Sequence, residues 1–82
     1  MAKTEPDIDF KPVRIAVLTI SDTRGMDDDR SGDTLSERLQ SAGHILAART
    51  IVKDDRATIA NQFREWAADP NIEVIISTGG TG

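Results

Sequence analysis

Two kinds of hydrophobic pattern alternate along this chain, and their order constrains the fold more than any other feature. Short apolar runs fill residues 13–20, 44–52 and 72–77, and bounded runs of this length predict buried β-strands. Residues 31–42 and 56–68 instead repeat apolar residues at helical spacing. Strand, helix, strand, helix, strand with short connections predicts a three-layer α/β unit with a parallel sheet and right-handed crossovers.

Each predicted helix has an apolar stripe along one side. The stripe of the first helix consists of Leu35, Leu39 and Ala42, and that of the second consists of Ile59, Ala60, Phe63, Trp66 and Ala67. Within the second stripe, Phe63 and Trp66 are interpreted as core, or as interface in an oligomer.

The second predicted strand has a less regular apolar pattern than the other two, because Ala47, Ala48 and Arg49 dilute it.

Turn-forming residues mark where the predicted helices end. Gly43 follows the first helix as a residue that can terminate it in a left-handed conformation. Pro70 and Asn71 stop the second helix. Either Asp54 or Asp55 can cap the start of the second helix.

Composition excludes several classes of function. The net charge is −4 and basic residues are scattered, so we expect no nucleic-acid partner. The absence of cysteine excludes disulfides, thiolate chemistry and cysteine-ligated zinc. The longest apolar stretch is too short to span a bilayer, and the polar start has no secretion-signal core. We expect a cytoplasmic protein without a membrane partner, with a flexible leader over residues 1–12.

Polar residues follow all three predicted strands at the point where each strand ends. They are residues 21–23 (Ser-Asp-Thr), 53–55 (Lys-Asp-Asp) and 78–82 (Thr-Gly-Gly-Thr-Gly). Ligands of open α/β sheets bind outside the carboxyl ends of strands, where the strand order reverses. If the strand order is 2-1-3, a crevice opens between the first and third strands, with Asp54 beside it.

The glycine-rich end of the third strand is the strongest candidate for a binding site. Thr78, Gly79, Gly80, Thr81 and Gly82 directly follow a buried β-branched run. Glycine permits positive φ angles that let neighbouring N–H groups converge on an anion, and a ligand can approach closely where Cβ atoms are absent. Phosphate is the usual ligand of such a turn. The alternative is a tight turn without a ligand, and the segment matches neither the P-loop nor the dinucleotide motif.

The aspartates near this edge allow structural and functional interpretations. Ser21 and Asp22 can simply start a turn, or they can line a pocket facing the glycines. One aspartate suffices to cap the second helix, so the other is free to hold Mg²⁺ against phosphates. The consecutive aspartates at 27–29 are interpreted as a solvated loop and helix cap rather than as a metal site.

Four segments together resemble the molybdenum-cofactor biosynthesis MoaB/Mog family, and most of all its bacterial B-type members. They are residues 18–22 (LTISD), 28–32 (DDRSG), 51–55 (IVKDD) and 77–82 (STGGTG). A strand ending in Thr-Gly-Gly-Thr-Gly is specific when Ser-Asp also follows the first strand, whereas either piece alone is weak. The resemblance runs over residues 13–82.

The resemblance implies a doubly wound α/β domain that binds molybdopterin, a pterin with a dithiolene and a terminal phosphate. Active members of the family transfer AMP from Mg-ATP to that phosphate, and they assemble as homo-oligomers, trimers or hexamers. By position, residues 78–82 would hold phosphate, and Ser21 and Asp22 would line the pocket. Asp54 would be the catalytic residue and would help to place Mg²⁺.

The family has a second functional aspartate shortly after its glycine loop, and the sequence ends before that position. We therefore expect these residues to form the front half of a longer domain, with adenylyl transfer belonging to the complete protein. A non-catalytic carrier of molybdopterin is the alternative within the same pathway. A receiver-like module is disfavoured because residues 77–79 offer no aspartate acceptor, and a flavodoxin-like module requires a bound flavin.

Overall fold

The computed structural model describes residues 11–22 and 29–79. Its elements in chain order are β1 (Arg14–Ile20), α1 (Arg30–Ser41), β2 (Ile45–Val52), α2 (Arg56–Ala67) and β3 (Val74–Gly79). The alternation of strands and helices confirms the predicted α/β class. Every element begins and ends within two residues of its predicted bounds.

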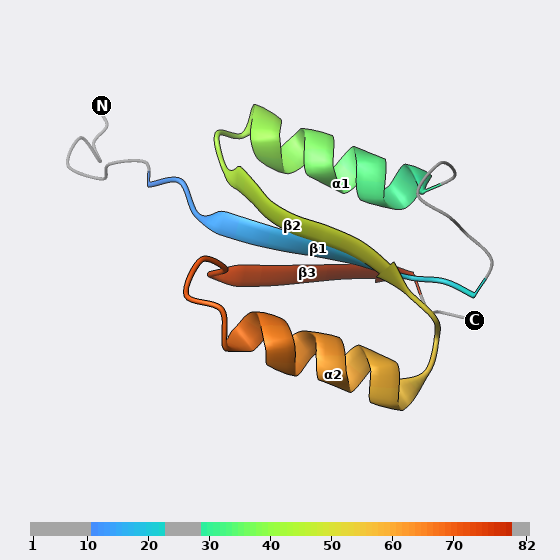
Figure 1. The fold of residues 1–82 in the computed structure, drawn as a ribbon. Helices are drawn as coiled ribbons and strands as arrows, with labels where there is room; N and C mark the ends of the chain where they lie inside the picture. Colours follow the sequence, from blue (N-terminus) through green and yellow to red (C-terminus); the bar gives the residue numbers. More distant parts are fainter. Residues whose placement is uncertain (1–10, 23–28, 80–82) are drawn as a thin grey trace, which may run out of the picture.

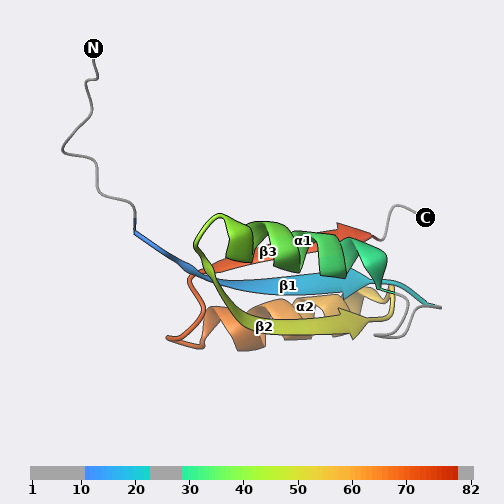
Figure 2. The same cartoon turned by 90° about the horizontal axis from the view of Figure 1, so that it is seen from above.

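The three strands form one parallel sheet in the order β2-β1-β3. This is the 2-1-3 order on which the predicted crevice depends. The two helices cover opposite faces of the sheet, α1 on one and α2 on the other (Figure 1). Seen from above, the three strand arrows point the same way (Figure 2). The described residues therefore form a three-layer α/β/α unit.

The central strand β1 is buried on both faces because a helix covers each of them. On the α1 face, Ile15 and Val17 pack against Leu39. Residues 15–18 are all at most 5% exposed, which explains why their run is continuously apolar. The core cluster on the α2 face consists of Ala16, Leu18 and Trp66.

Small residues let α1 approach the sheet closely at its first turns. Gly32 and Ser36 are buried together with Leu39 on the inner side of the helix. Ala42, the third residue of the predicted stripe, is instead exposed, because the helix ends before it and Ala42 is the C-cap. Gly43 then terminates the helix with a φ of 95°, as predicted.

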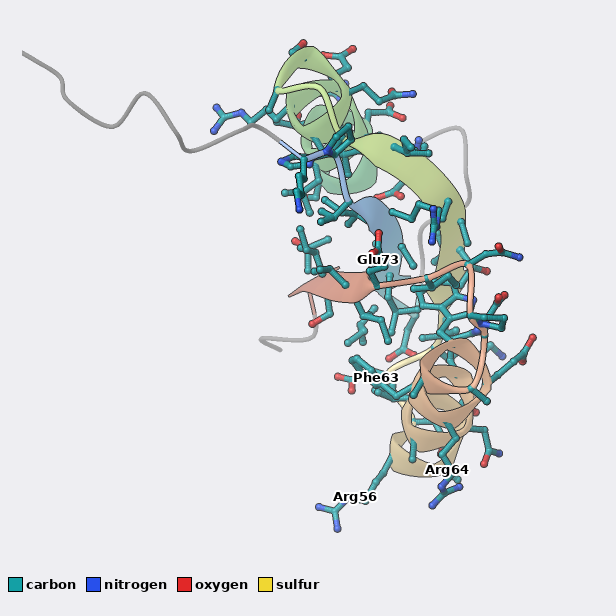
Figure 3. The ribbon with its side chains drawn as sticks, turned by 90° about the vertical axis from the view of Figure 1, so that its left-hand side faces the viewer. Arg56, Phe63, Arg64 and Glu73 are labelled. Atoms are coloured by element: carbon teal, nitrogen blue, oxygen red, sulfur yellow. The ribbon has the colours of Figure 1, made fainter. Side chains whose placement is uncertain are left out.

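The aromatic residues of α2 supply its contact with the sheet. Trp66 is 6% exposed, and Phe63 packs against the same cluster. Phe63 points from α2 toward the sheet, whereas Arg56 and Arg64 point away from it (Figure 3). Of the two predicted alternatives, core or oligomer interface, Trp66 takes the first, and Phe63 is partly buried beside it.

Strand β3 begins and ends two residues later than predicted. Ile72 still belongs to the turn after α2, where its N–H donates to the Asp69 C=O at 3.1 Å. At the other end, Thr78 and Gly79 pair with the last two residues of β1. The beginning of the glycine-rich segment is thus part of the sheet, because β1 extends far enough to pair with it. No helix within residues 11–22 and 29–79 is long and apolar enough to cross a membrane.

Candidate functional site

The carboxyl ends of the three parallel strands meet at one edge of the sheet, which we call the carboxyl edge (Figure 1). The Ser21 N–H donates to the Val52 C=O at 2.8 Å, so β1 and β2 stay joined at their ends. Gly80, Thr81 and Gly82 lie outside the described residues. The predicted site residues that the structure brings to this edge are Ser21, Asp22, Asp54, Thr78 and Gly79.

Asp22 links the first two strand ends directly. Its Oδ1 accepts a hydrogen bond from the Asp54 N–H at 3.0 Å. Both residues are exposed at the carboxyl edge. The bond uses the backbone of Asp54, so it leaves the Asp54 carboxylate available for another partner.

Asp55 is the residue that caps α2. Its Oδ2 accepts hydrogen bonds from the Thr58 hydroxyl at 2.7 Å and from the Thr58 N–H at 2.9 Å. These bonds lower the pKa of the Asp55 carboxyl, and the hydroxyl contributes most. The sequence left open which aspartate caps the helix. Because Asp55 does so, Asp54 is free of that role.

Gly79 occupies a position that a larger residue would strain. Its φ is 90°, a left-handed conformation that favours glycine. A Cβ at this position would lie 2.3 Å from the Ile20 carbonyl oxygen, well inside van der Waals contact. The ends of β1 and β3 can therefore lie this close only because residue 79 is glycine.

A shallow hollow lies beside the start of α2. It is lined by Asp54, Arg56 and the apolar residues Ile59 and Ala60. Arg56 is exposed and extends away from the sheet (Figure 3). The hollow thus lies among an acidic, a basic and two apolar residues. Arg56 is not among the site residues predicted from the sequence, although it directly follows two aspartates at a strand end.

A buried polar cluster lies between β1, β2 and the start of α1. The Asp29 side chain is fully buried, and its carboxylate accepts from the Thr19 hydroxyl at 2.8 Å and from the Gly32 N–H at 3.0 Å. Arg49 of β2 donates to the same carboxylate at 3.0 Å and to Asp33 at 2.7 Å. We call Thr19, Asp29 and Arg49 the buried clamp.

Burial and hydrogen bonding act in opposite directions on Asp29. Burial alone raises the pKa of its carboxyl group, but the bonds from Gly32, Thr19 and Arg49 together lower that pKa below its ordinary value. The pKa of Arg49 is raised, above all by its hydrogen bond to Asp33. Both groups of the buried pair are therefore charged at neutral pH.

The prediction that Asp29 lies in a solvated loop is wrong. Asp29 caps α1, as predicted, but its side chain is buried. The reason is that Thr19, a hydroxyl within a buried apolar strand, needs a partner, and an unsatisfied buried hydroxyl costs about 1–3 kcal/mol. Thr19 and the strand residue Arg49 were the two signals that could have indicated a buried acid.

The carboxylates at the carboxyl edge suit a metal ion that is held partly by substrate phosphates. Within the described ranges, no three His, Cys, Asp or Glu side chains are grouped so that they could hold a metal ion by themselves. Mg²⁺ is usually bound through one or two carboxylates together with substrate phosphates. Asp54, with Asp22 hydrogen-bonded to its backbone, fits that arrangement by ligand chemistry.

A parallel α/β unit with a polar carboxyl edge defines a class of small-ligand-binding domains. Residues 16–82 match the family described as "Probable molybdopterin binding domain". The chain belongs to this family. The resemblance stated from four sequence segments is thereby confirmed.

Two relatives that share the same name align with most of the chain. Molybdenum cofactor biosynthesis protein B of Escherichia coli (strain K12) is 45% identical over 74 residues, which are 90% of this chain and 44% of that protein. The protein of the same name from Bacillus anthracis is 40% identical over 72 residues, which are 88% of this chain and 43% of that protein. The chain therefore spans less than half the length of these relatives.

A solved structure confirms the fold. A crystal structure of Molybdenum cofactor biosynthesis protein B superposes with a TM-score of 0.85 and is 40% identical in sequence. The superposition covers 88% of this chain and 45% of that chain. The β2-β1-β3 sheet with its two covering helices is thus a fold unit found in that larger structure.

Proposed function

We propose that this protein binds molybdopterin at the carboxyl edge and acts in molybdenum cofactor biosynthesis. The observation that carries the proposal is the match of residues 16–82 to the molybdopterin-binding family, because that stretch includes the ends of all three strands. The pathway is supported by the name that the relatives from Escherichia coli and Bacillus anthracis share.

Two features of the carboxyl edge suit a ligand that ends in a phosphate. Both helices begin at this edge, and helix N-termini carry partial positive charge (Figure 1). Gly79 begins a glycine-rich segment whose N–H groups can converge on an anion. Since Asp22 and Asp54 make the edge acidic, the phosphate would be held by amides and a cation rather than by net charge.

In the complete protein, we propose that the molybdopterin phosphate receives AMP from ATP. Mg²⁺, bound by Asp54 and the phosphates, would neutralise the negative charge that builds up there. The hydrogen bond from the Asp54 N–H to Asp22 holds the Asp54 backbone at the end of β2. The amides of the glycine-rich segment would fix the phosphate through preorganised hydrogen bonds. A trimeric or hexameric homo-oligomer belongs to the same proposal.

The decisive variant is Asp54→Asn in the complete protein. We expect AMP transfer to molybdopterin to fall about 100-fold, the scale of loss when a group that places a reactant is removed. Binding of molybdopterin itself should change little, because the phosphate is held by amides. The measurements are the rate of AMP transfer and the dissociation constant of molybdopterin.

The matched control is Asp55→Asn, which removes the same charge one residue later. Asparagine caps a helix as well as aspartate does, so α2 should keep its start and AMP transfer its rate. Unchanged transfer in Asp54→Asn would remove Asp54 from the mechanism. An unaltered protein that binds molybdopterin but consumes no ATP is a carrier, and one that does not bind it contradicts the proposed function.

A further inference from the structure

We propose that the buried clamp positions the carboxyl edge for its ligand, with Asp29 as the positioning residue. This inference rests on the proposed binding of molybdopterin. None of the three clamp residues is among those assigned to contact the ligand. Their role would be to set the relative positions of the elements that carry the contacting residues.

The clamp joins three elements next to the proposed site. Thr19 lies two residues before Ser21, and in the sheet its Cα pairs with that of Thr78 in β3. Asp29 connects Thr19 to the first turn of α1, which it caps. Arg49, from β2, donates both to the Asp29 carboxylate and to the Asp29 C=O. One buried carboxylate therefore connects β1, β2 and α1.

The packing around Asp29 leaves little freedom for movement. A Cβ on Gly32 would lie 2.0 Å from the Asp29 Oδ2 and 2.9 Å from the Thr19 hydroxyl oxygen. The start of α1 can reach this depth only because residue 32 is glycine. Any shift of the Asp29 side chain must therefore move the first turn of α1 relative to the end of β1.

A contribution to folding stability does not by itself explain why the Asp29–Arg49 ion pair is buried. A buried ion pair can often be replaced by apolar residues of similar volume without loss of stability. Charged hydrogen bonds add fixed distances and directions, which apolar packing does not. The Asp29 side chain is 0% exposed, whereas that of Asp33, the other carboxylate bound to Arg49, is 55% exposed. Asp33 thus offers a matched control.

The test uses four single variants of the full chain and measures molybdopterin affinity by anaerobic equilibrium dialysis. Asp29→Asn removes the charge that faces Arg49, and Thr19→Val removes the hydroxyl with little change in volume. We expect these two variants to bind molybdopterin about tenfold more weakly, while Thr19→Ser and Asp33→Asn stay within about twofold of the unaltered chain. Affinity within twofold in Asp29→Asn overturns the proposal.

Variants at Leu39 separate positioning from simple destabilisation. Leu39 packs α1 on β1 and is not a partner in the clamp hydrogen bonds. Leu39→Val and Leu39→Ala should give graded losses of stability. At equal free energy of unfolding, we expect only Asp29→Asn to lose affinity. An equal loss of affinity in a stability-matched Leu39 variant overturns the positioning role.

Hydrogen exchange distinguishes failure of the clamp from failure of the proposed function. If the unaltered chain does not bind molybdopterin, the proposed function fails, but the clamp is still tested at the Ser21 amide, which bonds to the Val52 C=O. The Ser21 amide should exchange about tenfold faster in Asp29→Asn than in a stability-matched Leu39 variant. Equal exchange of that amide in both variants overturns the clamp.

Discussion

At the scale of single residues, Asp29 has the most unusual environment in the described part of the chain. Its carboxylate is removed from water, yet it accepts hydrogen bonds from a hydroxyl, a backbone amide and a guanidinium. Three donors compensate the cost of burying the charge, which is the usual condition for a buried acid. Protonation of Asp29 at low pH should therefore weaken both the fold and the hydrogen bonds of the clamp.

The lowered pKa of Asp29 predicts a specific pH dependence of stability. Because the pKa is lower in the folded than in the unfolded chain, the carboxylate stabilises the fold above its ordinary pKa, and this contribution disappears as pH falls through the lowered folded value. In Asp29→Asn, the free energy of unfolding should therefore fall less steeply with acid. Fluorescence of Trp66, the single tryptophan, reports unfolding by denaturant at each pH.

Asp55 provides the comparison at an exposed position. Its pKa is also lowered, by Thr58, so Asp55→Asn should flatten the acid profile in the same direction. Added salt should reduce the effect at Asp55 far more than at Asp29, because exposed charges are screened much more strongly than buried ones. Parallel acid profiles for Asp29→Asn and the unaltered chain would contradict the assigned role of the clamp.

At the scale of elements, the first turn of α1 is held close to β1 by the lack of a side chain at Gly32. Alanine is favoured over glycine within a helix by about 1 kcal/mol. A Cβ here would collide with Asp29 and Thr19, however, and overpacking costs about 1–3 kcal/mol. We therefore expect Gly32→Ala to lower the free energy of unfolding by about 1 kcal/mol, measured by urea titration.

Thr34→Ala tests the helix propensity of α1 by itself. Thr34 is exposed two residues after Gly32, so alanine there should stabilise the helix by about 0.5 kcal/mol. The two substitutions should thus change stability in opposite directions. Stabilisation by Gly32→Ala would show that α1 does not need its close approach to β1.

At the scale of the whole molecule, the two outer strands of the sheet, β2 and β3, differ in the features that protect their outer sides. Among the described residues, neither β2 nor β3 pairs with a further strand on its outer side. The pairing of β2 with β1 is interrupted by a register shift, and β2 carries Arg49, whereas β3 has no charged residue and exposes Val74 by 39%. Flat, uncharged edge strands favour edge-to-edge pairing between chains.

In a chain of residues 1–82 alone, where no described strand pairs with the outer side of β3, we expect self-association through β3 as the concentration rises, measured by sedimentation velocity. Ser77→Lys places a charge on an exposed position of β3 and should weaken this association about tenfold, since lysine is the usual protection of an edge strand. Ser41→Lys, at an exposed position on α1, adds the same charge and should have no effect. Equal association of both variants would place the contact elsewhere.

Local patterns in the sequence predict the elements and the edge at which the candidate site residues gather. The apolar runs, the helical stripes and Gly43 act over a few residues, so their outcome can be read without the fold. The general rule for parallel sheets then places Ser21, Asp54 and Thr78 at one edge, as the structure confirms.

Features that depend on residues distant in the sequence could not be predicted in this way. Thr19, Asp29 and Arg49 are separated by 10 and 20 residues, and they meet only after α1 has packed on the sheet. The pairing of Thr78 and Gly79 with β1 likewise depends on how far the neighbouring strand extends. Local propensity therefore specifies which elements form and at which edge their polar ends lie. Burial, by contrast, is a property of the assembled layers, and it alone turns an aspartate expected in a solvated loop into the centre of a charged clamp.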